Sequence, residues 1–168
     1  MATTYEAIAT VEVGSGGAAT LAFSSIPGTY TDLKLVASTR DTNATINNGL
    51  FSITLNGSTT FTSAKNLSGS GAGAAGSGAG DIFVGGGDTA GNTANTFSNV
   101  EVYFPNYTST AQKSISADAV SEQNGTTAYM ALTAQLFNLT TAITSISVAG
   151  RTGFAEFTTA TLYGIKNS

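Results

Sequence analysis

The clearest structural signal in this chain lies at residues 113–137, which read KSISADAVSEQNGTTAYMALTAQLF. In the first part of the stretch, apolar residues at every second position alternate with Ser and Asp, which is the pattern of a β-strand with one buried face. Asn124-Gly125 separates this part from a second run over 128–137, and both residues of the pair tolerate positive φ angles. The stretch therefore predicts a β-hairpin with a tight turn at Asn124-Gly125.

The same alternation recurs on both sides of this hairpin. No segment repeats apolar residues at the i, i+3, i+4 and i+7 spacing of an amphipathic helix. A single isolated sheet would leave one apolar face in water, so two sheets must pack together. We expect an all-β, antiparallel β-sandwich of the jelly-roll type with about nine to ten strands. Besides the hairpin, the alternating runs are 5–13, 19–23, 30–39, 50–56, 96–104, 143–148 and 156–165.

A glycine-rich region interrupts the pattern in the middle of the chain. Residues 69–80 are all Gly, Ala or Ser, and a second glycine-rich run follows at 85–95. A segment with no side chain larger than Ser contributes nothing to a core. We expect 69–95 to be a long loop that leaves the sheet, in a chain that otherwise forms one domain over 1–168.

The composition argues against several classes of protein. The chain has no His, Cys or Trp, and only 6 Lys and Arg against 10 Asp and Glu, for a net charge of -4. Without His a Ser-His-Asp triad cannot form, and without Cys there are neither disulfides nor thiolate metal sites. Few and dispersed basic residues predict no nucleic-acid partner and no anionic membrane. The N-terminal sequence and the absence of a long apolar run predict no signal peptide, no membrane span and synthesis in the cytosol.

Two motifs could indicate a ligand, and each has a plainer explanation. The string at 71–76 matches the dinucleotide-binding spacing G-x-G-x-x-G, but the strand and helix that this motif needs are missing around it. Asp81 and Asp88 flank a run of three glycines and could hold calcium, whereas Asp in such a position also simply favours turns. We favour the plainer explanation for both.

Acidic and aromatic residues raise two further possibilities. Two carboxylates could pair across a sheet, as in a glycosidase, although isolated acids on polar strand faces are usually solvated. Candidates among the ten acidic residues include Asp32, Glu101 and Glu156. The aromatic residues Tyr103, Phe104 and Tyr107 could stack on a sugar, but aromatic residues at a strand end more often cap the core. We assign no catalytic, cofactor-binding or metal-binding residue and expect no enzymatic activity.

Four segments spread over nearly the whole chain share a recognisable pattern. They read YEAIA (5–9), LAFSSIPGTYTDLKLV (21–36), ITLNG (53–57) and ATLYGI (160–165). Together they resemble a family of small virion proteins from tailed bacteriophages, notably marine and cyanobacterial ones. The resemblance is strongest at the two ends of the chain, and it carries over no functional residues.

This resemblance implies a non-enzymatic structural protein of the virion. The leading expectation is a capsid decoration, or cement, protein that binds the major capsid protein or other virion proteins and stabilises the head shell. The alternative is an adhesin on a fibre or tail, in which the loops at 69–95, with Tyr103 and Tyr107, contact host glycans. We also expect a homo-oligomer, and a trimer on a threefold position would cover the sheet edges.

Overall fold

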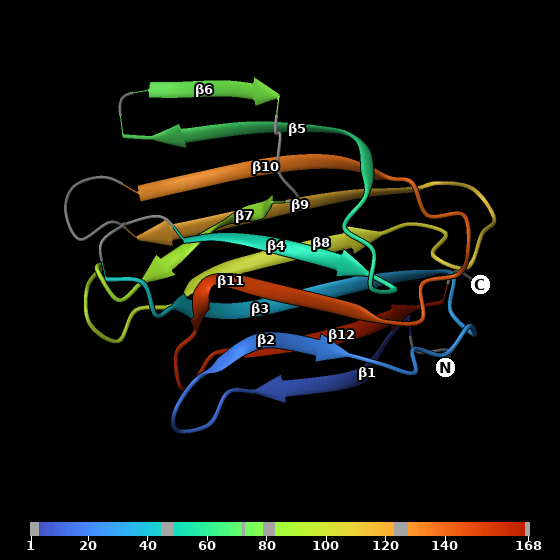
Figure 1. Ribbon diagram of the computed structural model, residues 1–168, viewed down its shortest axis with the longest axis horizontal. Helices are drawn as coiled ribbons and strands as arrows, with labels where there is room; N and C mark the ends of the chain where they lie inside the picture. Colours follow the sequence, from blue (N-terminus) through green and yellow to red (C-terminus); the bar gives the residue numbers. More distant parts are fainter. Residues whose placement is uncertain (1–3, 45–48, 72, 79–82, 123–127, 167–168) are drawn as a thin grey trace.

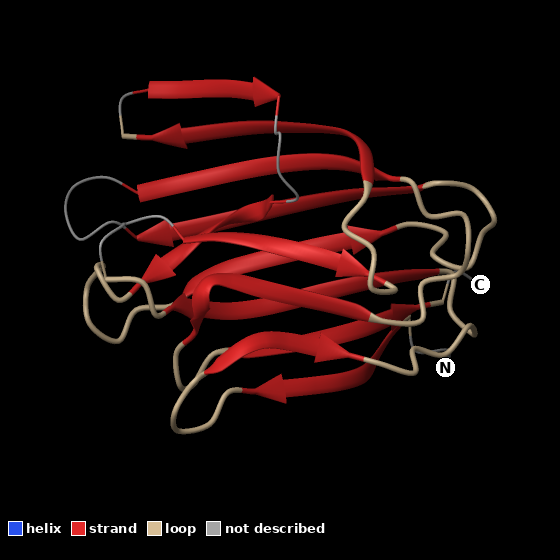
Figure 2. Cartoon of the chain, viewed as in Figure 1, coloured by secondary structure: helices blue, strands red, loops and turns tan. Residues whose placement is uncertain are grey.

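A computed structural model describes residues 4–44, 49–71, 73–78, 83–122 and 128–166. Within these residues the chain forms twelve strands and no helix, so this part contains no helix that could span a membrane (Figure 2). The strands are β1 (Tyr5–Glu12), β2 (Ala18–Phe23), β3 (Asp32–Asp41), β4 (Gly49–Leu55), β5 (Phe61–Ser70), β6 (Gly73–Gly78), β7 (Phe83–Thr89), β8 (Ser98–Phe104), β9 (Lys113–Glu122), β10 (Ala128–Phe137), β11 (Ile146–Phe154) and β12 (Thr159–Ile165).

The strands form two sheets that pack face to face (Figure 1). The large sheet has the order β1-β12-β3-β8-β9-β10-β5-β6, and every neighbouring pair in it is antiparallel. The small sheet has the order β2-β11-β4-β7. The end of β3 joins the two sheets, because Arg40 and Asp41 pair with β7 and Asp41 also pairs with Phe154 of β11.

Eight of the strands follow the jelly-roll order. When β5, β6, β9 and β10 are set aside, four strands remain in each sheet, in the orders β1-β12-β3-β8 and β2-β11-β4-β7. The chain then crosses between the sheets at every connection except the one from β4 to β7, as two interlocked Greek keys require. The prediction of an all-β sandwich of the jelly-roll type is confirmed. Neighbouring strands within each sheet are antiparallel as predicted, and the short pairing of β3 with β7 that joins the sheets is parallel.

The remaining four strands extend the large sheet beyond β8, and we call them the wing (β9-β10-β5-β6). The predicted hairpin of 113–137 supplies two of them, since β9 and β10 pair antiparallel from Glu122 and Ala128 onward. The Asn124-Gly125 turn itself lies outside the described residues. The strand β7 of the small sheet covers the inner face of β9 and β10.

The core fills the space between the sheets as one connected cluster. Alternation explains it, because β4 and β9 each bury every second residue. From the small sheet the cluster takes Leu21, Phe23, Phe51, Ile53, Leu55, Ile146, Val148 and Phe154. From the large sheet it takes Leu33, Leu35, Ala37, Val100, Val102, Phe104, Ile115, Ala117, Ala119, Phe137, Ala160 and Leu162.

The prediction of a loop over 69–95 is wrong for most of its described residues. The strand count is twelve rather than nine or ten because this region supplies β6 and β7, and because β5, which begins at Phe61, was not predicted. Residues 69–70 end β5, residues 73–78 form β6 against it, and residues 83–89 form β7. A sequence pattern could not reveal β5 and β6, because they bury almost no large side chains. β5 is a strand because its backbone bonds to β10 along the length of that strand. β6 is a strand because it bonds in turn to the other side of β5.

Candidate functional site

The outer face of the large sheet carries the two features that could bind a partner. Alternation sends every second side chain of its strands away from the core, toward solvent. Over β12, β3 and β8 these side chains surround a shallow groove, and over the wing they form an area of exposed apolar residues. We describe the groove first.

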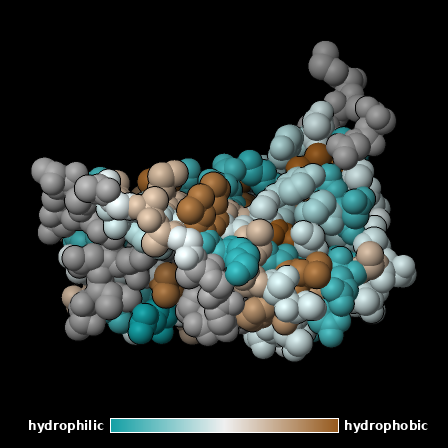
Figure 3. All heavy atoms as spheres, turned by 90° about the horizontal axis from the view of Figure 1, so that it is seen from above, coloured by the Kyte–Doolittle hydropathy of each residue, from teal (hydrophilic) through white to brown (hydrophobic). Residues whose placement is uncertain are grey.

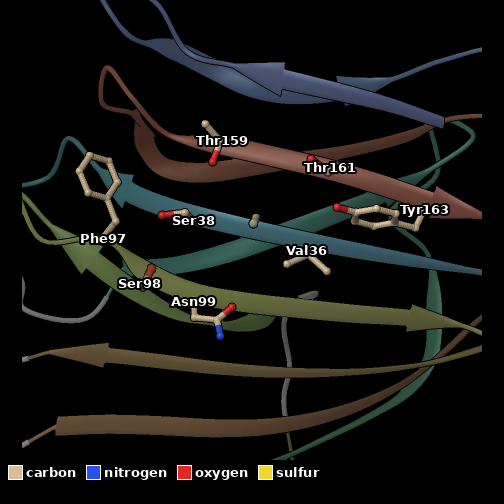
Figure 4. A pocket seen from close by; sticks show the side chains of 9 residues that line it. Val36, Ser38, Phe97, Ser98, Asn99, Thr159, Thr161 and Tyr163 are labelled. Atoms are coloured by element: carbon tan, nitrogen blue, oxygen red, sulfur yellow. The ribbon is translucent and has the colours of Figure 1, made fainter. Parts of the chain in front are cut away.

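The groove has a volume of about 270 Å³ and lies across three neighbouring strands. In Figure 4 the ring of Phe97 stands at one end and the ring of Tyr163 at the other, with polar side chains between them. Tyr163 is held from the side by Tyr5, whose ring meets it edge-on at 6.4 Å. The lining residues are Val36, Ala37, Ser38, Phe97, Ser98, Asn99, Thr159, Thr161 and Tyr163.

None of the residues that line the groove carries a charge. The nearest charged residues in the sheet register are Lys34, which lies opposite Tyr163, and Glu101, which lies opposite Val36. These two ions pair with each other at 2.6 Å, and the hydrogen bond to Glu101 raises the pKa of Lys34. The groove therefore offers hydroxyl and amide hydrogen bonds and two aromatic rings, which suit an uncharged polar ligand.

The second feature, which we call the apolar patch, comprises Leu67, Val120, Met130 and Leu132 on the outer face of the wing. Each of these side chains is between 48% and 56% exposed. The register brings them together, because Met130 lies opposite Val120 and Leu132 lies opposite Leu67. Shallow, mainly apolar hollows surround them and reach Ala74 of β6.

The apolar patch differs from its surroundings. Seen from the side on which β6 lies, most of the surface is hydrophilic or intermediate, and hydrophobic residues form separate areas (Figure 3). Other large exposed apolar side chains of the described residues are Tyr5, Tyr103 and Phe157, and none of these three belongs to the wing. A cluster of Leu, Met and Val in water is typical of a surface that meets a partner.

The structure corrects the proposed sugar-stacking set of aromatic residues. Phe104 and Tyr107 are buried in the core, and the Tyr107 hydroxyl donates to the Pro27 carbonyl. Tyr107 therefore cannot contact a glycan, and the explanation that these residues cap the core is confirmed for both. Only Tyr103 is exposed, at 37%. Its hydroxyl donates to Asp32 Oδ2 at 2.7 Å, and this hydrogen bond raises the pKa of Tyr103 to about 12.

The three candidate carboxylates do not form one site. Asp32 is buried and accepts hydrogen bonds from Tyr103 and from the Asn106 N–H, while Glu101 is paired with Lys34. Glu156 lies in the turn between β11 and β12, whereas Asp32 is at the opposite end of the same register, across from Ile165.

The candidate calcium and nucleotide sites receive no support from the geometry. Asp88 is buried, its Oδ1 accepts the Glu122 N–H at 2.9 Å, and burial raises its pKa; Asp81 lies outside the described residues. Among the residues with described positions, no group of three or more acids is arranged to hold a metal ion. The described residues of 71–76 belong to the β5–β6 hairpin rather than to a strand that leads into a helix.

Comparison of the chain with protein-family models, with curated proteins and with solved structures found no match.

Sequence reasoning missed both the groove and the apolar patch. One signal for the patch was present, because β10 alternates large apolar residues with Thr133 and Gln135. The structure buries these two polar side chains and exposes Met130 and Leu132, which is the reverse of the usual arrangement.

Proposed function

We propose that this chain is a non-enzymatic structural protein of a bacteriophage particle, a capsid decoration protein that binds the major capsid protein and stabilises the head shell. The apolar patch is the observation that carries the proposal. Its four side chains extend from three adjacent strands of a wide sheet, a broad surface for contact with a shell. The resemblance of the four sequence segments to small virion proteins supports the same role.

The energetics of the apolar patch suit a protein that binds in many copies. Full burial of a Leu, Val or Met side chain is worth roughly 1.5–3 kcal/mol, so covering the exposed half of each contributes about 1 kcal/mol. Four such contributions make a weak contact for a single copy. A repeated shell lattice adds contacts to several subunits at once, and the combined affinity rises steeply.

Binding to particles tests the proposal directly. Purified chain is added to particles that lack it, and we expect many copies over the shell, whereas Leu67→Ser combined with Leu132→Ser lowers occupancy at least tenfold. The control is Phe157→Asn, which removes an exposed apolar side chain outside the patch and retains a residue that tolerates the φ of 68° at this position. A reconstruction with the chain only at the tail would refute the proposal.

The groove favours a second candidate, an adhesin that binds an uncharged glycan. Phe97 and Tyr163 offer ring faces for sugars, and the Ser, Thr and Asn side chains between them offer hydrogen bonds. A glycan array tests this function, with Phe97→Ala and Tyr163→Ala expected to abolish any signal. An array without a signal, together with a location on the shell, would exclude it.

A further inference from the structure

The strand β6 has a free side. It pairs with β5 along its whole length without a register shift, from Ser70 opposite Gly73 to Lys65 opposite Gly78, and no other described strand pairs with it. Its sequence is GAAGSG, so this edge has no charged residue and no proline. Unpaired N–H and C=O groups on such an edge are a template for another strand.

The opposite edge of the same sheet carries charged residues and a pairing irregularity, which protect it against the addition of another strand. The outermost strand there is β1, which carries Glu6 and Glu12 and has an irregularity in its pairing between Ala7 and Ala9. Glu6 also pairs with Lys166 at 3.2 Å. Charges and bulges on an edge discourage strand addition. The β1 edge of the large sheet is therefore protected against strand addition, whereas the β6 edge has neither charges nor an irregularity in its pairing.

A strand made only of Gly, Ala and Ser is stabilised more than most strands when a second strand pairs with it. Gly and Ala have low β propensity, and a strand without large side chains has almost nothing but backbone hydrogen bonds to hold it. At an edge, only one side of the backbone is bonded. A second strand on the free side would satisfy the remaining groups.

We propose that β6 pairs antiparallel with β6 of a second copy of this chain, across a two-fold axis perpendicular to the sheet, which makes a dimer rather than the trimer expected from the sequence. A second copy fits because the edge matches itself: two strands with no side chain larger than Ser approach without steric conflict. No like charges meet at this edge, although each chain carries a net charge of -4. The two large sheets become one, and the two apolar patches lie on the same face of it.

The symmetry fixes which residues meet. A two-fold axis perpendicular to a sheet keeps each side chain on its own face, so one residue of β6 must lie opposite its own copy. For a strand of this length that residue is Ala75 or Gly76. The Cα atoms of directly opposite residues are about 4.5–5.5 Å apart, within the range that a disulfide can bridge.

Cysteine scanning tests this interface cleanly, because the chain contains no cysteine. Ala74→Cys, Ala75→Cys, Gly76→Cys and Ser77→Cys are oxidised separately, and we expect a disulfide-linked dimer to form most completely at position 75 or 76. The control is Ala9→Cys, an exposed alanine on the β1 edge, which should stay monomeric on a denaturing gel.

The mass in solution provides the second measurement. We expect the unmodified chain to show twice the mass of one 16.8 kDa chain by light scattering, and Ala75→Lys to show half of that with an unchanged circular dichroism spectrum. The matched control, Ala9→Lys, should remain a dimer. A monomer or a trimer in solution, cross-linking only at position 9, or pairing of β6 only with a shell protein on particles would overturn the inference. The mass and the cross-linking are measured on the isolated protein, so failure of either would leave the proposed role on the capsid unaffected.

Discussion

Asp41 shows how one side chain holds the two sheets together. It is buried at the end of β3, where the large sheet meets the small one. Its Oδ2 accepts the Arg151 N–H at 2.6 Å, and its Oδ1 accepts the Thr152 hydroxyl at 2.8 Å and the Asn43 N–H at 2.7 Å. A carboxylate only accepts hydrogen bonds, so it suits a site where every neighbouring group donates.

Asp41→Asn should therefore lower the free energy of unfolding by about 3 kcal/mol. The amide NH₂ of Asn is a hydrogen-bond donor, and the groups that surround this position also donate. Asp118→Asn is the matched control on the outer face of β9. Partial burial and Glu101 raise the pKa of Asp118, so loss of its charge should change stability by less than about 0.5 kcal/mol. Urea denaturation measures both, and equal effects would contradict this account of Asp41.

Tyr103 gives a prediction about pH. Its pKa in the folded chain is about 12, above the ordinary tyrosine value of 10.0, because of the hydrogen bond to Asp32. A raised pKa means that the bond contributes its full stability below pH 10 and loses it as the pH rises toward 12. Ultraviolet titration of tyrosinate should show that Asp32→Asn moves one tyrosine to lower pH. A titration curve identical to that of the unmodified chain would contradict the assignment.

Among the elements, β7 shows why a glycine-rich segment can be an integral strand. A Cβ at Gly87 would collide with the Phe51 ring and lie 2.7 Å from Ser98 Oγ, so glycine is required for β7 to approach the core this closely. Gly87→Ala should cost about 1–3 kcal/mol of stability. Gly14→Ala, where a Cβ meets nothing within 4 Å, should be neutral. Melting temperatures of the two variants test the difference, and similar values would refute it.

The elements also show where sequence reasoning succeeds and where it ends. Runs with large residues on one face, such as β3, β4 and β9, could be predicted because alternation itself encodes their buried side. Segments such as β5 and β6 could not, because β5 depends on backbone bonds to β10 and β6 on backbone bonds to β5, and this pairing leaves no pattern in their side chains. The groove could not be predicted either, since Phe97, which directly precedes β8, and Tyr163 of β12 are 66 positions apart, and only the order β12-β3-β8 brings them to the same groove.

For the whole molecule, low charge predicts how binding responds to salt. The described residues contain two ion pairs, Lys34 with Glu101 and Lys166 with Glu6, and neither lies within the apolar patch. Attachment through that patch should persist up to roughly 0.5 M sodium chloride, which screens ions but does not weaken apolar contacts. Sedimentation of decorated particles through rising salt measures this. Release below that concentration would indicate an ionic contact instead.

The position of β12 has a consequence for how the protein is made. It is the last of the described strands, yet it lies between β1 and β3 and bonds to both along nearly its full length. During synthesis the first and third strands leave the ribosome long before the strand that joins them. The nascent chain must keep these two edges from other partners until residues 159–165 emerge, and the fold can close only after translation of this strand is complete.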